Sequence, residues 1–198
     1  MPEIKIRISG WTYPPWRGVF YPEKLRQKDE LSYASSQFRT MKINGTFYGT
    51  QKPQSFSKWF DATPEDFVFS VKAPRFITHI RRLRDVETPL ANFFASGVLC
   101  LGRKFGPILW QFPPSLKFDK KLFSDFFALL PHDTDKAALL AKGHDSRVKG
   151  GAWETGEKRS LRHAVEIRHE SFRDEVFIKL CAFITSLWFA PILWNGPG

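Results

Sequence analysis

The chain has 198 residues, of which 42% are hydrophobic and 16% aromatic, and its formal net charge at pH 7 is +10. A chain of this length and apolar content can bury a substantial core, so we expect a single domain over residues 1–198 and exclude a mainly disordered state. The longest apolar stretch, residues 181–194, is too short and too interrupted to span a bilayer, and residues 1–8 lack the apolar centre of a signal peptide. We therefore expect a cytoplasmic protein without a membrane partner.

Short apolar runs that end on polar or charged residues are spaced along the chain. They are residues 4–9, 41–44, 67–72, 108–111 and 164–168. Helix-like stretches separate them, and this alternation is typical of a parallel sheet covered by helices. The sequence therefore predicts an α/β protein.

Apolar spacing predicts the helices between these runs. The first stripes contain Leu31 to Phe38 and Phe56 to Phe60. Thr88 followed by Pro89 reads as a helix N-cap and first position, with the helix ending near Gly97.

Two later stretches are also expected to be helical. Asp119 is expected to cap a helix that repeats apolar residues to Leu130, and a further helix covers residues 176–184. Between them, residues 132–160 are basic, contain glycines and have no clear period, so we expect a surface insertion or loop there.

The period of two sorts the strand residues onto two faces. One face is bulky and apolar; the other collects Lys42, Asn44, Lys72, Gln111, Glu166 and Arg168. If the sheet curves into a barrel, these polar side chains point inward near its carboxyl rim, where ligands bind. Buried ions without partners are costly, so the pattern indicates either a ligand pocket or a paired network of Glu166 with Arg168 or Lys72.

Positive charge is concentrated in two stretches. The first holds Lys72, Arg75, Arg81, Arg82 and Arg84, and the second holds Lys142, Arg147, Lys149, Lys158, Arg159 and Arg162. Such a surplus indicates an anionic small molecule or nucleic acid as partner, although basic surface can also serve solubility alone.

Motifs that would identify a cofactor are absent from the sequence. Cys100 and Cys181 lie in apolar runs without CxxC or metal spacing, which predicts buried, unreactive thiols and no disulfide. There is no GxGxxG, Walker or GxSxG pattern. The cofactor is therefore left unknown, and no residue is assigned to a metal.

The segment from Ser9 to Pro22, SGWTYPPWRGVFYP, resembles the first strand and loop of the YecE-like family, domain of unknown function 72. Further matches follow in the family's order: residues 43–48, 71–72 with 77–79, 106–114 and 165–169. The resemblance covers roughly residues 4–180 and implies a TIM-barrel-type parallel sheet with outer helices. The family's function is not established, so the resemblance implies no activity.

The chain also departs from the family pattern. The family usually has glutamate where this chain has Lys42 and serine where it has Gly45, which makes the rim more positive and weakens any metal proposal. No resemblance is expected after about Phe183, and residues 188–198 read as a foreign or truncated tail. Because an eight-repeat barrel takes about 250 residues, we expect an incomplete barrel of five to six βα units that can self-associate through its exposed carboxyl-terminal edge.

The first functional hypothesis is a binding module or enzyme for phosphate-bearing ligands, including nucleic acid. Lys42, Lys72, Arg75 and Arg168 would hold the anion, and Asn44 and Gln111 would add directional hydrogen bonds. Trp11 and Tyr13 would stack on a base or sugar, unless the first loop only plugs the barrel mouth.

The second hypothesis, by analogy with barrels of the endonuclease IV type, is a metal-assisted or acid–base hydrolase. Glu166, Lys72 and His79 form the candidate catalytic set, with Glu166 as base and His79 or His169 as proton carrier or ligand. The remaining alternative is an inactive fragment whose site lacks its later-strand half.

Overall fold

The computed structural model describes residues 7–183 and 187–189. A parallel sheet with strand order β1-β2-β3-β4-β5-β6 forms its centre, so each strand lies beside the next one in the sequence. The strands are β1 (Arg7–Ser9), β2 (Thr40–Ile43), β3 (Val68–Lys72), β4 (Phe105–Gln111), β5 (His163–Glu166) and β6 (Leu187–Phe189). The predicted α/β, TIM-barrel-type parallel sheet is confirmed. No strand pairing among the described residues joins β6 back to β1.

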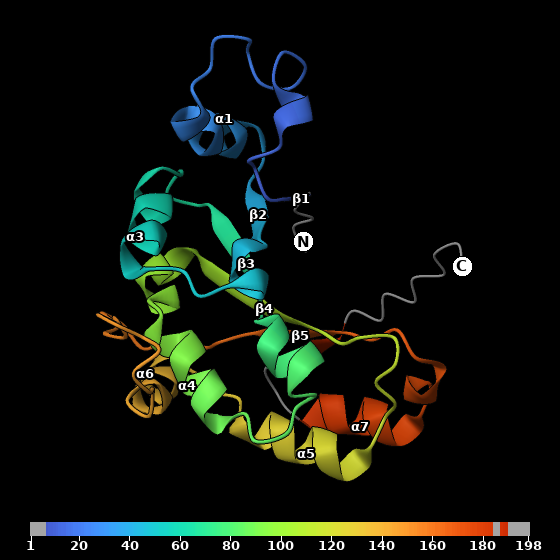
Figure 1. Ribbon diagram of the computed structural model, residues 1–198. Helices are drawn as coiled ribbons and strands as arrows, with labels where there is room; N and C mark the ends of the chain where they lie inside the picture. The colour runs from blue at the N-terminus through green and yellow to red at the C-terminus, as the bar shows by residue number, and fades with distance from the viewer. Residues whose placement is uncertain (1–6, 184–186, 190–198) are drawn as a thin grey trace.

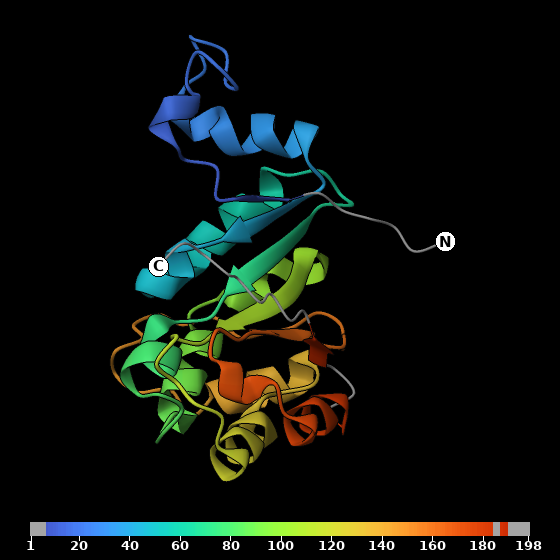
Figure 2. The same ribbon diagram turned by 90° about the vertical axis from the view of Figure 1, so that its right-hand side faces the viewer.

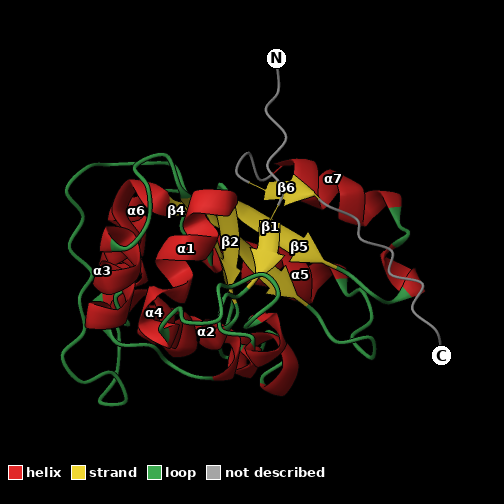
Figure 3. Ribbon diagram, turned by 90° about the horizontal axis from the view of Figure 1, so that it is seen from above, coloured by secondary structure: helices red, strands yellow, loops and turns green. Residues whose placement is uncertain are grey.

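Helices connect the strands and cover one side of the curved sheet (Figures 1 and 3). They are α1 (Glu30–Gln37), α2 (Gly45–Tyr48), α3 (Pro53–Asp61), α4 (Glu87–Ala95), α5 (Lys120–Leu129), α6 (Thr134–Ala141) and α7 (Glu175–Phe183). The 3-10 segments are η1 (Pro14–Trp16), η2 (Gln27–Asp29), η4 (Val98–Lys104) and η5 (Glu170–Phe172), and a π-helix, η3 (Phe76–Ile80), follows β3. Figure 2 shows the strands stacked one below another, with α5 and α7 beneath the lower strands.

The hydrophobic core lies between the sheet and these helices. Met41, Phe69, Val71, Trp110 and Val165 are fully buried on the helix-facing side of the strands. Bulky apolar residues at every second position make this face of the strands largely apolar, with the buried His163 as a polar exception, and place the residues of the predicted polar set on the other face. The predicted sorting of the strand residues onto two faces is therefore confirmed.

The N-cap predicted from the sequence is found at the start of α5 but not at the start of α4. Asp119 caps α5 as predicted, because its Oδ1 accepts a hydrogen bond from Leu122 N at 2.9 Å. The prediction for α4 was wrong at its start: the helix begins at Glu87 with Val86 as N-cap, so Thr88 lies inside the first turn. A proline in the first turn needs no backbone donor, so Pro89 is tolerated there without marking the first helical residue.

Part of the region expected to be a surface loop is helical. Helix α6 begins after Asp133, whose Oδ1 accepts from Lys136 N at 2.8 Å, and its buried residues Thr134, Ala137 and Ala141 lie one turn or less apart. Small alanines rather than bulky apolar residues face the neighbouring helix α4, which is why the pattern gave no clear period. The rest of residues 132–160 contains no further helix or strand.

The expected burial of the two cysteines holds for Cys181 and only in part for Cys100. Cys181 is buried, Cys100 is half-buried, and neither forms a disulfide. Burial raises the pKa of both thiols, that of Cys181 to about 12, so neither is a reactive thiolate at neutral pH. Within the described residues, no helix is both long and apolar enough to cross a membrane.

Candidate functional site

Polar side chains from four neighbouring strands lie on the face of the sheet opposite the core. Lys42 is paired in register with Ser70, Lys72 with Leu109, and Gln111 with Glu166, so the carboxyl ends of these strands share one side. We call Lys42, Lys72, Gln111, Glu166 and Arg168 the rim cluster. The parallel register brings these residues together as the sequence predicted.

Glu166 is the acceptor at the centre of the rim cluster. Its Oε1 accepts hydrogen bonds from Gln111 Nε2 at 2.5 Å and from Arg168 Nε and Nη2 at 3.0 and 2.7 Å. Burial raises the pKa of Glu166, but the hydrogen bonds from Gln111 and Arg168, with the charges of Arg168 and Lys72, outweigh burial and hold it below its usual value. Glu166 is therefore an ionised, well-partnered carboxylate and a weak base.

Lys72 stands in a positive environment. Burial lowers the pKa of its ammonium group; Lys42 and Arg168 lower it further, and Glu166 opposes them. Its Nζ lies 3.9 Å from the centroid of the Phe47 ring, a cation–π contact. One carboxylate thus faces three cationic side chains, and the cluster carries a surplus of positive charge.

His79 adds a titratable group beside this cluster. It lies in the π-helix η3, its ring meets the Phe47 ring edge to face at 5.1 Å between centroids, and its Nδ1 is 2.8 Å from Thr78 Oγ1. Burial lowers the pKa of His79, and the charges of Lys72, Arg75, Arg168 and Arg82 lower it further. The imidazole is therefore neutral at pH 7, and every charged group that acts on it is a cation.

Arg75 and Asn44 lie at the ends of strands β3 and β2, at the entrances to the helical segments that follow. Arg75 is exposed at the N-cap of η3 and acts on His79 through its charge. Asn44 is the N-cap residue of α2, and its Oδ1 is buried without a hydrogen-bond partner. Both therefore border the rim cluster, and the Asn44 Oδ1 is a buried acceptor that a ligand donor would satisfy.

The two candidate stacking residues lie elsewhere. Trp11 packs against Trp59 and Phe69, with ring centroids 5.3 and 6.2 Å apart, and Phe69 belongs to the helix-facing side of the sheet. Tyr13 is 53% exposed and packs edge to face on Trp16. Because Trp11 packs toward the helix-facing side and Tyr13 packs within the first loop, we leave both out of the proposed site.

His169 has a local structural role. Its Nδ1 accepts a hydrogen bond from Ser171 N at 3.1 Å, and through this bond the His169 side chain caps η5. The same Nδ1 lies 2.9 Å from Ser171 Oγ. The Ser171 hydroxyl in turn accepts from Phe118 N at 2.8 Å. His169 therefore ties the segment after β5 to the loop after β4.

Two residues that shape the site were not assigned to it from the sequence, although Thr46 was considered as a possible polar contact. The Phe47 ring contacts both the Lys72 ammonium group and the His79 ring. Thr46 Oγ1 donates to the carbonyl oxygen of Lys72 at 2.7 Å and so joins α2 to the end of β3. Both residues belong to the family-like segment 43–48, but nothing in their spacing distinguishes a site residue from a core residue.

The family model described as "Protein of unknown function DUF72" matches residues 5–195. The chain belongs to the DUF72 family. This match corrects the expectation that the resemblance ends near Phe183. It also extends over most of the segment read as a foreign tail, in which Trp188 and Phe189 pair with β5 as part of β6. Residues 190–198 lie outside the described residues.

Two relatives share about a third of the aligned residues. UPF0759 protein YunF of Bacillus subtilis is 31% identical over 116 residues, 56% of this chain and 40% of the relative. UPF0759 protein YecE of Escherichia coli K12 is 30% identical over 127 residues, 57% of this chain and 44% of the relative. The aligned part therefore spans less than half the length of these relatives.

Solved structures of DUF72 proteins have the same fold. The protein from Thermotoga maritima matches with a TM-score of 0.63 at 27% identity, covering 91% of this chain and 61% of that one. A protein from Enterococcus faecalis matches with a TM-score of 0.61 at 16% identity, covering 94% of this chain and 60% of that one, which supports the fold alone. None of these names states an activity.

Proposed function

We propose that the rim cluster binds the phosphate group of a small anionic ligand. The observation that carries this proposal is the charge imbalance around Lys72: Lys42 and Arg168 act on it as cations, and among the described residues Glu166 is the carboxylate that opposes them. Glu166 is also engaged by Gln111 and Arg168, which reduces its power to neutralise the two lysines. A dianionic phosphate placed beside Lys42, Lys72 and Arg168 would relieve this repulsion and gain charge-assisted hydrogen bonds.

A compact ligand fits this site better than a nucleic-acid strand. Lys42, Lys72 and Gln111 are half-buried on the inner side of the sheet, and Trp11, the larger candidate stacking ring, is packed on the other side. Binding of a strand relies on exposed basic and aromatic side chains that follow the backbone. We therefore place nucleic acid second, as an outcome to be tested by salt dependence.

The hydrolase hypothesis has less support from the geometry. The lowered pKa of Glu166 makes it a weak base, and His169 is occupied in capping η5. In the part of the chain that the structure describes, no three His, Cys, Asp or Glu side chains gather closely enough to hold a metal ion. Lys72 and His79 remain candidates for contacting a ligand rather than for catalysis.

Calorimetric titration with inorganic phosphate tests the proposal. The change Lys72→Met keeps the length and apolar stem of the side chain but removes its charge, and we expect the affinity for phosphate to fall about tenfold or more, as for loss of one hydrogen bond between charged groups. Lys121→Met is the matched control, because the Lys121 side chain is 86% exposed and its ion pair is with Asp125 in the same helix. The control should bind phosphate as the unchanged chain does.

Two results would decide against the proposal. Equal phosphate affinity of the Lys72 and Lys121 variants would show that phosphate binds elsewhere or through general charge. Tight binding of an oligonucleotide would favour nucleic acid over a compact ligand if the logarithm of the affinity falls linearly with the logarithm of the salt concentration. The slope of that line should then correspond to several neutralised phosphates.

A further inference from the structure

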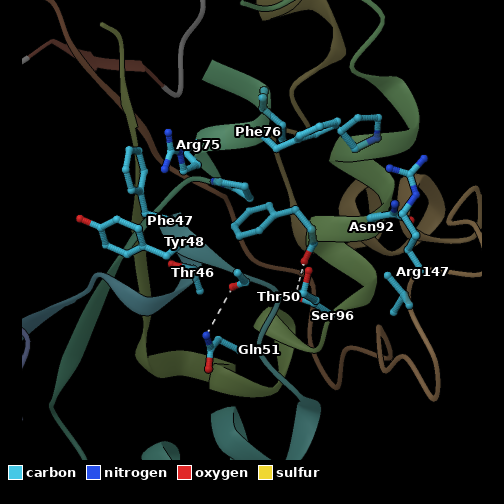
Figure 4. A pocket seen from close by; sticks show the side chains of 16 residues that line it. Thr46, Phe47, Tyr48, Thr50, Gln51, Arg75, Phe76, Asn92, Ser96 and Arg147 are labelled. Atoms are coloured by element: carbon cyan, nitrogen blue, oxygen red, sulfur yellow. Dashed lines mark hydrogen bonds between the residues drawn. The ribbon is translucent and has the colours of Figure 1, made fainter. Parts of the chain in front are cut away.

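A pocket lies next to the rim cluster, and Phe47 is shared between the two. It has a volume of about 230 Å³ and is enclosed by α2 and the loop after it, the π-helix η3, helix α4 and the loop after α6 (Figure 4). This is less than the roughly 300–1,000 Å³ of pockets for drug-sized ligands, so it suits a ligand of about one ring. Lys72 and Arg168 are not among the described residues that line it.

The walls of this pocket combine aromatic rings with positive charge. Phe47, Tyr48, Phe76 and Phe93 supply rings, and two of them, Tyr48 and Phe76, are exposed to solvent by 74% and 41%. The lining includes two arginines, Arg75 and Arg147, but no aspartate or glutamate among the described residues. An apolar pocket with cations and no anions favours a negatively charged ligand with an aromatic body.

The two arginines differ in how far they are already neutralised. Arg147 Nη2 lies 3.0 Å from Asp145 Oδ2, and Asp145 also accepts from Asn92 Nδ2 at 3.2 Å. The Arg75 side chain makes no ion pair or hydrogen bond with the described residues, and in Figure 4 it stands across the pocket from Arg147. Arg75 therefore has its full hydrogen-bonding capacity available for an incoming anion.

The backbone around the pocket is unusual. Arg75 and Phe76 open the π-helix η3, a conformation that is rare and frequent at functional sites. Shortly after it, Arg82, Leu83 and Asp85 have positive φ angles of 48°, 68° and 47°, which side chains other than glycine rarely adopt. This segment directly follows η3, which forms one wall of the pocket.

We infer that this pocket binds a small aromatic carboxylate, with the ring between Phe76 and Phe93 and the carboxylate at Arg75. The site is separate from the phosphate site proposed above and does not depend on it. The features of the ligand that the pocket would recognise are a single planar aromatic ring and one negative charge at the edge of that ring.

Benzoate is the test ligand, and benzamide is its neutral match in shape. In ¹H–¹⁵N NMR titrations of the whole chain, benzoate should shift the amide signals of Phe76 and Asn92 saturably, with a Kd below about 1 mM, and benzamide should bind about tenfold more weakly. Arg75→Gln should weaken benzoate about tenfold, and Arg147→Gln should weaken it less because Asp145 already neutralises that guanidinium. Thr50→Trp, at an exposed residue of the lining, should block the pocket.

The same experiment separates this inference from the phosphate site. Lys72→Met should leave benzoate affinity unchanged, and Thr50→Trp should leave phosphate affinity unchanged. The inference is wrong if benzoate and benzamide bind alike, if neither Arg75→Gln nor Thr50→Trp weakens benzoate, or if no saturable shift appears. If the unchanged chain binds benzoate but not phosphate, the proposed function is wrong and the inference about the aromatic carboxylate stands.

Discussion

Strands β4 and β5 carry two polar clusters on opposite faces of the same strand pair, and the two are built differently. On the helix-facing side, Trp110 Nε1 donates to His163 Nδ1 at 3.0 Å, and His163 Nε2 bonds the carbonyl of Pro131 at 2.8 Å. On the inner side, Gln111 and Arg168 converge on Glu166 near two further lysines. The first cluster is neutral and has every polar atom of its two rings paired; the second is half-exposed and positively charged.

This contrast separates a structural polar group from a candidate binding group. Trp110 and His163 are fully buried, and burial with hydrogen-bond partners on all sides stabilises one neutral arrangement. The rim cluster instead gathers three cationic side chains and one carboxylate, and this surplus of positive charge disfavours the unliganded state. The first cluster should therefore control stability and the second ligand affinity.

Removing the buried imidazole should produce the largest effect. His163→Leu leaves the Trp110 indole N–H and the Pro131 carbonyl without partners in the core, so we expect the free energy of unfolding to fall by about 2–5 kcal/mol. Urea denaturation measures this loss, and the double change Trp110→Phe with His163→Leu should recover part of it because one orphaned donor is removed. The contrast between the two clusters is wrong if His163→Leu changes the free energy of phosphate binding by as much as the free energy of unfolding.

The buried imidazole should also make stability depend on pH. Burial lowers the pKa of His163 to about 4 from its usual 6.5, so between these values the unfolded chain binds a proton that the folded chain refuses. The contribution is complete above pH 6.5 and is lost as the pH falls toward 4, by about 3 kcal/mol in total. Unfolding measured at several pH values should show this slope in the unchanged chain and a smaller one in His163→Leu.

The sequence was sufficient to predict the rim cluster because residues alternate at the carboxyl ends of the strands, beyond the register shift between β3 and β4. Once β2, β3, β4 and β5 are aligned in parallel, Lys42, Lys72, Gln111 and Glu166 must share a face. The same alternation identified the core strands, since their apolar residues are bulky and occur at every second position. Both predictions needed only the period of the chain.

Residues on loops and short helices could not be placed in this way. His169 sits beside the site in the sequence, but a local hydrogen bond to Ser171 directs its ring into a cap. Trp11 is drawn to Trp59 and Phe69 by packing that no local pattern reveals. Helix α6 was missed because alanines fill its contact face, which gives almost no apolar period.

Changing the single carboxylate of the rim cluster should sharpen the contrast. Glu166→Gln keeps the size of the side chain and an acceptor for Gln111 but removes the negative charge, so the cations lose their internal partner. We expect phosphate to bind about three- to tenfold more tightly, and stability to change far less than in His163→Leu. Calorimetry with inorganic phosphate measures the gain; weaker binding would mean that Glu166 is needed to orient Arg168 rather than to compete with the ligand.

The smallest effect should appear at His79. Burial and the charges of Lys72, Arg75, Arg168 and Arg82 lower the pKa of this imidazole, so an anion bound among those cations must move the pKa upward and draw protons onto the ring as it binds. NMR titration of the His79 ring signals against pH, with and without saturating phosphate, measures the shift. His144 packs on Trp153, away from the rim, and its ring signals should stay in place when phosphate is added. Because the shift at His79 reports charge rather than contact, its absence in a chain that still binds phosphate would place the anion outside the field of the rim cluster.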